Sequence, residues 1–281
     1  MNSIKEKIMR GVFFAAAMVS AAAVLLICLF LFAHGIPAVH KAGAAEFFFG
    51  TNWSPSDVPP SFGIFPMILG SIYITAGAAL FGLPLGILTA VFLAKYCPKN
   101  LHRILKPATD LLAGIPSIIY GFFGLTAIVP AVRTLFGGSG CGILSALLLL
   151  GIMILPTVTG VCEAALHNVP AGCYEGALAL GATPERSIFF VVLPAAKSGI
   201  LASAVLGIGR AAGETMAVIT VAGNRARMPG GLFGGVRTLT ANIVIEMGYA
   251  SGLHREILIA CGALLLVFIL MINLIFAALK K

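Results

Sequence analysis

Long apolar runs with almost no charge constrain this chain more than any other feature. A membrane-spanning helix needs about 20 mostly apolar residues, and the sequence holds six runs of that kind. They cover residues 11–34, 66–94, 108–131, 142–162, 199–222 and 257–279. Charged residues are only 10% of the chain, whereas a soluble domain carries about 25%. The sequence therefore predicts an all-α, polytopic membrane protein with about six transmembrane helices.

The distribution of lysine and arginine predicts which loops face the cytoplasm. Cytoplasmic loops are enriched in these residues, and one set of span ends holds eleven of them against six on the other. The eleven are Lys5, Lys7, Arg10, Lys95, Lys99, Arg103, Lys106, Arg186, Lys197, Lys280 and Lys281. The six are Lys41, Arg133, Arg225, Arg227, Arg237 and Arg255. We expect the richer side, with both termini, to be the cytoplasmic side of the membrane.

This sidedness assigns the loops and the domains. Residues 35–65 and 223–256 are expected to be outer loops, and residues 163–198 an inner one. The basic N-terminus resembles a signal peptide, but the apolar run after it is too long for one. We interpret that run as a retained first span. We expect residues 1–65 to hold this span and the first outer loop, and residues 66–281 to form one membrane domain.

Charge and cysteine content argue against several classes of protein. The net charge is +8, but the basic residues flank apolar runs, so they indicate topology and not a nucleic-acid partner. The six cysteines include no Cys-x-x-Cys pair, and most lie in or beside apolar runs, where cysteine acts as a small apolar residue. The five histidines include no His-Glu-x-x-His pattern. We assign no metal and no cofactor to this chain.

The inner loop contains two short helix patterns. The stretch "GCYEGALALG" (172–181) has good helix formers, with Glu175 near its start and Gly181 where a helix would stop. In "TPERSIFFVV" (183–192), Thr183 is a candidate N-cap and Pro184 stands at the first helical position. Pattern alone favours an amphipathic segment at the membrane surface. The alternative is a compact helical pair that projects from the membrane.

The spacing across this loop resembles the EAA loop of ABC importer permeases. That motif reads Glu-Ala-Ala, three residues, Gly, nine residues, Ile, one residue, Leu-Pro. The matching residues here are Glu175, Gly176, Ala177, Gly181, Val191, Leu193 and Pro194. Gly176 and Val191 are mild departures. A literal Glu-Ala-Ala at 163–165 lacks the later Gly and Leu-Pro, so the spacing favours position 175.

The resemblance implies a type I ABC importer permease fold for residues 66–281. In that family the loop, here 170–194 with Thr183 and Pro184 opening its second helix, docks in a cleft of an ATP-hydrolysing subunit. The chain has no Gly-x-x-x-x-Gly-Lys-Ser/Thr pattern. We therefore expect ATP to be used by a partner subunit, and this chain to be a transporter subunit and not an enzyme.

Three further stretches resemble the permeases of the high-affinity phosphate importer. They are "LLAGIPSIIYGFFGL" (111–125), "GIGRAAGETMAVITVAGN" (207–224) and "TLTANIVIEMGYA" (238–250). The stretch "FFFGTNWSP" (47–55) resembles the C-type of its two permease subunits. The resemblance implies three partners: an A-type permease, a dimeric ATP-binding subunit and an extracytoplasmic phosphate-binding protein.

Arg210 and Glu214 are two charges inside the apolar run 199–222. At 1.5 Å per residue, Arg210 would lie roughly 16 Å into that span, near the bilayer midplane. Ionisable groups at that depth face a bundle interior or a pathway, and two charges four residues apart share one helix face. Two interpretations stay open. The pair fixes one helix against its neighbours, or it forms an oxyanion gate in which Arg210 binds phosphate and Glu214 holds Arg210 between substrates.

Other polar residues are weaker candidates. Ser117 and Tyr120 are placed on the substrate pathway as hydroxyl donors, although hydrogen bonds between helices explain them equally well. Asp110 is expected to be a cap or a cytoplasmic contact. The outer-loop arginines either attract an anion, contact the binding protein or are simply solvated. They are Arg225, Arg227 and Arg237.

Alternative functions remain for a polytopic chain of this kind. We expect an ATP-driven permease for phosphate, and a permease for another oxyanion is the near alternative. An ion-coupled secondary carrier is disfavoured because no internal repeat is evident and such a carrier has no use for an EAA loop. An intramembrane serine enzyme is disfavoured because "GGSGCG" (137–142) does not match Gly-x-Ser-x-Gly.

Overall fold

A computed structural model describes residues 2–279 of the chain. It consists of helices and one short hairpin. The helices are α1 (Asn2–Ala42), α2 (Ala44–Phe49), α3 (Phe65–Val91), α4 (Lys99–Gly114), α5 (Ser117–Phe123), α6 (Val129–Phe136), α7 (Ile143–His167), α8 (Ala171–Ala179), α9 (Pro184–Ser187), α10 (Leu193–Ala195), α11 (Lys197–Gly213), α12 (Met216–Val221), α13 (Leu239–Glu246) and α14 (Gly252–Leu279). The strands are β1 (Trp53–Ser54) and β2 (Ser61–Phe62), and π-helical turns cover Phe92–Tyr96, Gly124–Ile128 and Ile188–Val192.

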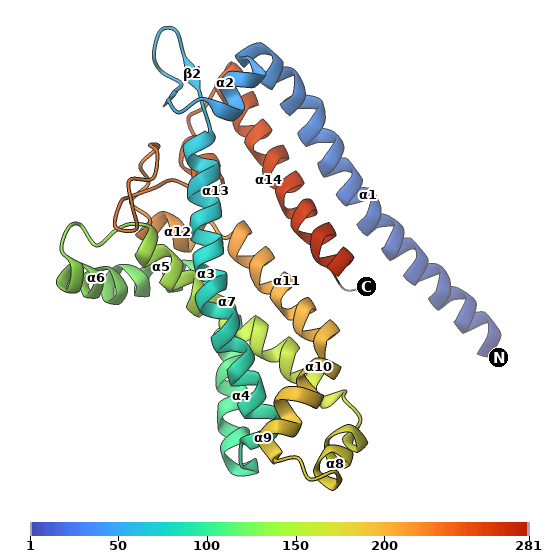
Figure 1. Cartoon of the computed structure of the whole chain (residues 1–281). Coiled ribbons are helices and arrows are strands. Elements are labelled where there is room, and N and C mark those ends of the chain that lie inside the picture. Colours follow the sequence, from blue (N-terminus) through green and yellow to red (C-terminus); the bar gives the residue numbers. More distant parts are fainter. Residues whose placement is uncertain (1, 280–281) are drawn as a thin grey trace.

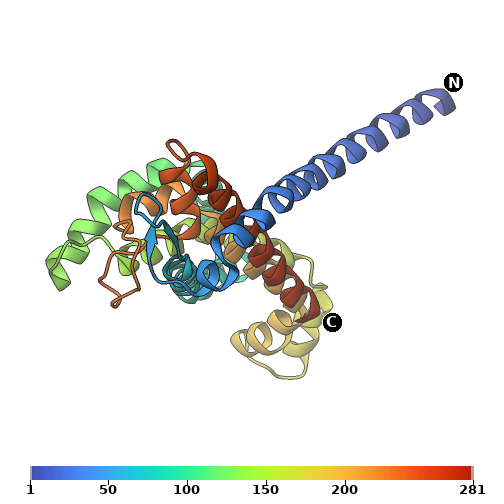
Figure 2. The same ribbon diagram turned by 90° about the horizontal axis from the view of Figure 1, so that it is seen from above.

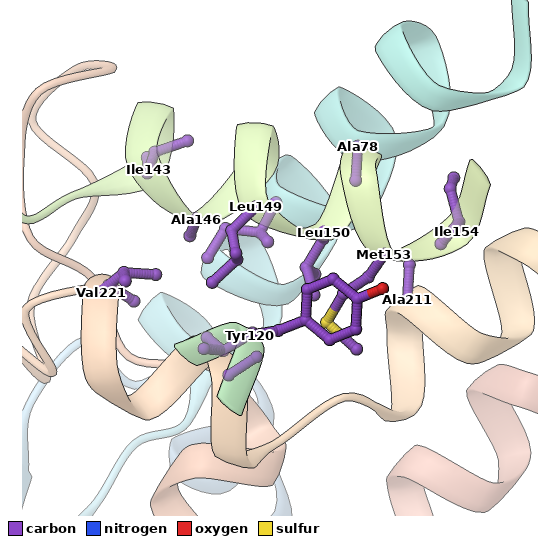
Figure 3. Close-up of a cluster of buried hydrophobic side chains, with 14 of the residues drawn as sticks. Ala78, Tyr120, Ile143, Ala146, Leu149, Leu150, Met153, Ile154, Ala211 and Val221 are labelled. Atoms are coloured by element: carbon purple, nitrogen blue, oxygen red, sulfur yellow. The ribbon is translucent and has the colours of Figure 1, made fainter. Parts of the chain in front are cut away.

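Helices α3 and α7 form the centre of the molecule, and α11 packs against both (Figure 1). Glycines allow the close approach of α3 to α7: a Cβ added at Gly82 would lie 2.6 Å from Ile154 Cγ1, and one at Gly86 would lie 2.8 Å from Val158 Cγ1. Such small residues bring helices together in membranes. Around this contact lies the largest buried apolar cluster, which includes residues of α5 and α12 (Figure 3).

The two ends of the molecule differ (Figure 1). Helices α8 and α9 lie at one end, beside the lower end of α4 in this view, and α2 with the β1–β2 hairpin lies at the other. Helix α1 packs against α14 and projects away from the rest of the chain, as the second view also shows (Figure 2). The apolar window of α1 contains no buried residue, so a large apolar surface is left for lipid or a partner.

Within residues 2–279, five helical segments are long and apolar enough to cross a membrane. They are Lys5–Ala42, Phe65–Tyr96, Ser117–Phe136, Ile143–His167 and Gly252–Phe276. A sixth arises if Pro184–Ala195 and Lys197–Gly213, which meet at 72°, count as one bent span. The prediction of an all-α polytopic protein with about six spans is confirmed, although the first span runs past residue 34 to Ala42.

The predicted span 108–131 is wrong at its start. Helix α4 ends at Gly114, Ile115 is extended with φ −68° and ψ 127°, and a new helix begins at Ser117. Pro116 explains the break, because proline lacks the amide hydrogen that would continue the helix and disfavours helical backbone in the residue before it. Residues 99–114 thus form a separate amphipathic helix with no buried residue.

The predicted span 199–222 is also wrong, because it contains a break. Helix α11 ends at Gly213, Glu214 is extended with φ −73° and ψ 131°, and α12 begins at Met216. The hydroxyl of Thr240 donates a hydrogen bond to the Glu214 carbonyl oxygen at 3.1 Å. A contact with the segment that opens α13 therefore stabilises the break. The loops expected at 35–65 and 223–256 likewise contain α2, the hairpin and α13.

Candidate functional site

The projecting pair α8–α9 has the local structure that its sequence predicts. Gly181 ends α8 in the left-handed region at φ 86°, and its amide donates to the Leu178 carbonyl at 2.9 Å. The amide of Ala182 donates to the Ala177 carbonyl at 3.1 Å, which completes a Schellman motif. Thr183 Oγ1 accepts the Arg186 amide at 3.3 Å, and Pro184 is the first residue of α9. The two caps fix the turn between the helices.

One side of this pair is anchored, and the other is open. Tyr174 packs with Ile188 and Val192 against a buried cluster at the ends of α3 and α7. The Lys95 ammonium lies 5.8 Å from the centre of the Tyr174 ring, a cation–π contact. Glu175 and Gly176 are exposed, as are Gly181, Thr183 and Pro184, and Ala177 is half-buried. The EAA-like residues thus lie together on a surface that the described chain leaves uncovered.

Gly176 has no internal reason to be glycine. A Cβ at this position would meet no atom within 4 Å, and glycine inside a helix costs about 1 kcal/mol relative to alanine. Within the described chain, α8 is therefore open to its surroundings at Gly176.

Arg210 lies on α11, half-buried and directed at α7. Its Nη1 donates to Thr157 Oγ1 at 3.0 Å. Among residues 2–279, Arg210 has no carboxylate within 4.0 Å. The expectation that Glu214 shares a helix face with Arg210 is wrong, because α11 ends at Gly213 before it reaches Glu214. The gate formed by the two residues stays a prediction. The guanidinium therefore meets one neutral hydroxyl and keeps most of its donors free.

Glu214 belongs to the break between α11 and α12. Its Oε1 accepts the Ala217 amide at 3.4 Å, near the start of α12, where the unpaired amides favour a carboxylate. Its backbone is tied to Thr240. Glu214 therefore acts on the connection between two helices, and the carboxylate is half-buried.

Tyr120 and Ser117 have different surroundings on α5. The Tyr120 ring is buried in the core cluster beside Met153 and Ala211 (Figure 3), and its hydroxyl donates to the Leu112 carbonyl at 2.8 Å. That bond joins α5 to the end of α4 across the break at Pro116. Ser117 is half-buried, and its hydroxyl has no hydrogen bond within the part of the chain that the structure describes. A pathway role for either residue stays a prediction.

Sequence reasoning missed an inner charge cluster, which consists of His102, Lys106 and Glu163. The buried carboxylate of Glu163 lies 2.9 Å from His102 Nε2 and 3.0 Å from Lys106 Nζ. Lys106 also pairs with Asp110 at 3.2 Å. Burial lowers the pKa of Lys106, but hydrogen bonds to Glu163 and Asp110 outweigh that effect, so the pKa lies above its ordinary value. The cluster attaches α4 to α7, and a carboxylate directly after the apolar run 142–162 was the sequence signal for it.

An outer charge cluster was missed as well, and it consists of Trp53, Arg237, Glu246 and His254. Trp53 Nε1 donates to Glu246 Oε2 at 2.9 Å, and His254 Nε2 lies 2.9 Å from the same oxygen. Arg237 pairs with Glu246 through Nη1. The same guanidinium donates to Asn242 Oδ1 at 3.0 Å and to the Asn224 carbonyl at 3.1 Å. The expectation that Arg237 is simply solvated is wrong, because its side chain is only 15% exposed and is paired with Glu246.

Comparisons with known proteins agree with this architecture. The family described as "Binding-protein-dependent transport system inner membrane component" matches residues 82–281. A Bacillus subtilis protein named "Probable ABC transporter permease protein YqgH" is 37% identical and covers 92% of this chain and 87% of its own. The "Phosphate transport system permease protein PstC" of Mesorhizobium japonicum is 36% identical, covering 90% of this chain and 84% of its own. Its Haemophilus influenzae namesake is 35% identical, covering 83% and 79%.

Solved structures show the same fold at lower identity. The permease of a bacterial ABC transporter that imports the acidic polysaccharide alginate aligns with a TM-score of 0.64 at 17% identity, over 99% of both chains. An inward-facing MetNI methionine ABC transporter aligns with a TM-score of 0.62 at 22% identity, over 76% of this chain and 93% of the other. The chain has the type I ABC importer permease fold. From this match and this fold we conclude that the protein is a multi-pass membrane protein of the binding-protein-dependent transport system inner membrane component family, a permease subunit of an ATP-driven importer.

Proposed function

We propose that this chain is the C-type permease subunit of a phosphate importer, and that Arg210 binds the phosphate on its way through the membrane. The observation that carries the proposal is the state of Arg210: a half-buried guanidinium on a helix of the core, with one threonine hydroxyl as its partner. The curated relatives named as phosphate transport system permeases, at 35–36% identity, support the choice of phosphate.

The chemistry of Arg210 suits an oxyanion. Guanidinium offers a planar fork of donors that matches phosphate oxygens and stays charged at any physiological pH. An unpaired charge is unfavourable in a bilayer, so an anion that reaches Arg210 gains a strong interaction without having to displace a carboxylate. Thr157 holds the guanidinium in position. The hydroxyls of Ser117 and Tyr120 are further candidates on the pathway.

Glu214 provides a way to release the anion from Arg210. It lies four residues beyond Arg210, on a helix break and not on the same helical turn. A change in the angle between α11 and α12 would bring the carboxylate toward the guanidinium and release the bound anion. In this proposal, Arg210 and Glu214 are paired in one transport state and apart in the other, and the break is the hinge.

The coupling surface on α8 and α9 would dock on an ATP-binding subunit. Glu175, Gly176 and Ala177 are on α8, and Gly181, Thr183 and Pro184 fix the turn that follows. A rigid, doubly capped pair transmits a rigid-body movement of the partner to α7 and α11. In this arrangement the partner hydrolyses ATP, the chain holds no nucleotide or cofactor, and both termini lie on the coupling side. The other partners are an A-type permease and an extracytoplasmic phosphate-binding protein.

Uptake into proteoliposomes tests the proposal. Vesicles holding this chain with its permease partner, the ATPase and the binding protein should accumulate radiolabelled phosphate when ATP is supplied to the ATPase side. Omission of either the ATPase or the binding protein should stop uptake. Phosphate entry without them would point to an ion-coupled carrier. Excess unlabelled phosphate or arsenate should compete with the uptake of radiolabelled phosphate. If excess sulfate competes and these two do not, the substrate is another oxyanion.

A charge reversal on α8 tests the coupling surface separately. Glu175→Lys should uncouple ATP hydrolysis from uptake, because Glu175 is exposed and has no structural role inside the chain. Gly176→Ala should retain coupling, since the family pattern has alanine at that place. Glu6→Lys, on the exposed part of α1, is a control with the same change in charge. Normal coupling in Glu175→Lys would contradict the assignment of this surface.

A further inference from the structure

A polar pocket lies at the end of the molecule opposite α8. Its walls are two segments far apart in sequence, which lie side by side in both views (Figures 1 and 2). One segment follows α2 and opens the hairpin, with Thr51, Asn52 and Ser54. The other follows α12, with Arg225 and Arg227. The pocket has a volume of about 800 Å³, which is ample for a hydrated tetrahedral ion.

The charged side chains that line this pocket are all positive. Arg225 and Arg227 are its charged lining residues. Both are exposed, and in the described part of the chain neither forms an ion pair within 4.0 Å. Arg237, twelve residues after Arg225, already donates to Glu246, Asn242 and a backbone carbonyl. The two pocket arginines are therefore available to a ligand from outside, together with hydroxyl and amide groups from the opposite wall.

The pocket walls are held by the outer charge cluster. Trp53 lies in one wall and donates its indole hydrogen to Glu246. On the other side, the Asn224 carbonyl just before Arg225 accepts a bond from Arg237, which pairs with the same Glu246. The Asn224 side chain donates to the Ile219 carbonyl at 2.7 Å, and its backbone is left-handed at φ 51°. One buried carboxylate thus fixes both walls, so the site is formed before a ligand arrives.

We propose that this pocket is an outer binding site for inorganic phosphate, distinct from Arg210, with Arg225 and Arg227 as its cationic ligands. The inference rests on the proposed transport of phosphate and adds a binding site that phosphate occupies before Arg210. Two guanidiniums and nearby hydroxyls match a tetrahedral oxyanion. Phosphate delivered at this end would bind in the pocket before it reaches α11. Less of it would then be lost to the surrounding solution.

Arginine modification locates the site without depending on transport. The complex in lipid nanodiscs, without binding protein, is treated with phenylglyoxal in phosphate or in chloride of equal ionic strength, and modified arginines are quantified by mass spectrometry. Phosphate at ten times its dissociation constant should slow modification of Arg225 and Arg227 about tenfold. Arg255, exposed at the start of α14, serves as the internal reference and should be unaffected.

Uptake kinetics complete the test. The double variant Arg225→Gln/Arg227→Gln should raise the phosphate KM about tenfold, whereas Arg255→Gln should change it less than about twofold. Equal modification rates of Arg225 and Arg227 with and without phosphate would overturn the inference. If the same preparation still takes up phosphate normally, the proposed function stands without the pocket. Protection without uptake would support the pocket and contradict that function. If phosphate-free binding protein protects the two arginines and phosphate does not, the inference is also overturned. The pocket would then bind carboxylates of a partner protein.

Discussion

Two arginines at different depths of this molecule have opposite surroundings. Arg237 pairs with the buried carboxylate of Glu246 and donates to Asn242 and a backbone carbonyl. Within residues 2–279, the side chain of Arg210 forms one hydrogen bond, to the Thr157 hydroxyl. A charge that pairs with a buried carboxylate inside the chain has a structural role, because its removal leaves that carboxylate buried without its ion-pair partner. A charge with one neutral partner in the described chain keeps donors available for a ligand, which is the basis of the role proposed for Arg210.

The same substitution at both sites should have the largest effect and separate the two roles. Arg237→Met leaves Glu246 buried without its strongest partner, so we expect a loss of about 3–5 kcal/mol in the free energy of unfolding. Arg210→Met removes an unpaired charge, so we expect stability to change by less than about 1 kcal/mol or to rise. Unfolding of each variant by SDS in mixed micelles measures both values. Equal losses at the two sites would abolish the distinction.

Removal of one neutral donor from the outer charge cluster should have a smaller effect. Trp53→Phe keeps the aromatic packing against Phe62 but removes the indole hydrogen bond to Glu246. We expect a loss of about 1–3 kcal/mol, as for a hydrogen bond to a charged group. The same SDS titration checks it, with Phe62→Leu as a control that changes packing alone. A Trp53→Phe variant as stable as the wild type would show that Glu246 does not need this donor.

Tyr120→Phe tests a neutral hydrogen bond in the core. The hydroxyl holds the end of α4 to α5, and its loss should destabilise the chain by about 1 kcal/mol. A structural role alone predicts normal phosphate uptake in this variant. Uptake that falls more than about tenfold at unchanged stability would instead place the Tyr120 hydroxyl on the pathway.

Thr157→Val should have the smallest effect. It removes the hydroxyl to which Arg210 donates in the described structure but leaves the guanidinium in place. We expect the phosphate KM to rise only a few-fold, corresponding to about 0.5–1 kcal/mol of lost positioning. Thr159→Val, a neighbouring residue that bonds the Gly86 carbonyl, is a control with the same substitution. A complete loss of uptake in Thr157→Val would mean that Thr157 itself binds the substrate.

Local features of this chain were predictable from sequence. The turn at Gly181, the cap at Thr183 and the helical start at Pro184 depend on residues within a few positions of one another, and all three are present. The long apolar runs also predicted most spans. These signals are local, because capping and burial in lipid act on one segment at a time.

Features that depend on distant segments were not predictable. The break after Gly213 is stabilised by Thr240 from another part of the chain. Residues 199–222 alone do not predict that contact. Glu246 meets Trp53, which precedes it by 193 residues. The sequence showed that charges lie in apolar runs, but only the fold shows which of them are paired. The pairing of Arg237 with Glu246, and the absence of a carboxylate beside Arg210 among the described residues, therefore became known only from the structure.

The ratio of phosphate transported to ATP hydrolysed tests the central claim most directly. It should be measured in proteoliposomes that hold the complete importer, with wild-type chain, Arg210→Ala or Arg210→Lys. We predict that Arg210→Ala hydrolyses ATP at close to the wild-type rate while phosphate uptake falls about a hundredfold or more, with Arg210→Lys between the two. Phosphate uptake by Arg210→Ala at the wild-type rate would contradict the claim that the unpaired arginine of α11 binds the transported anion.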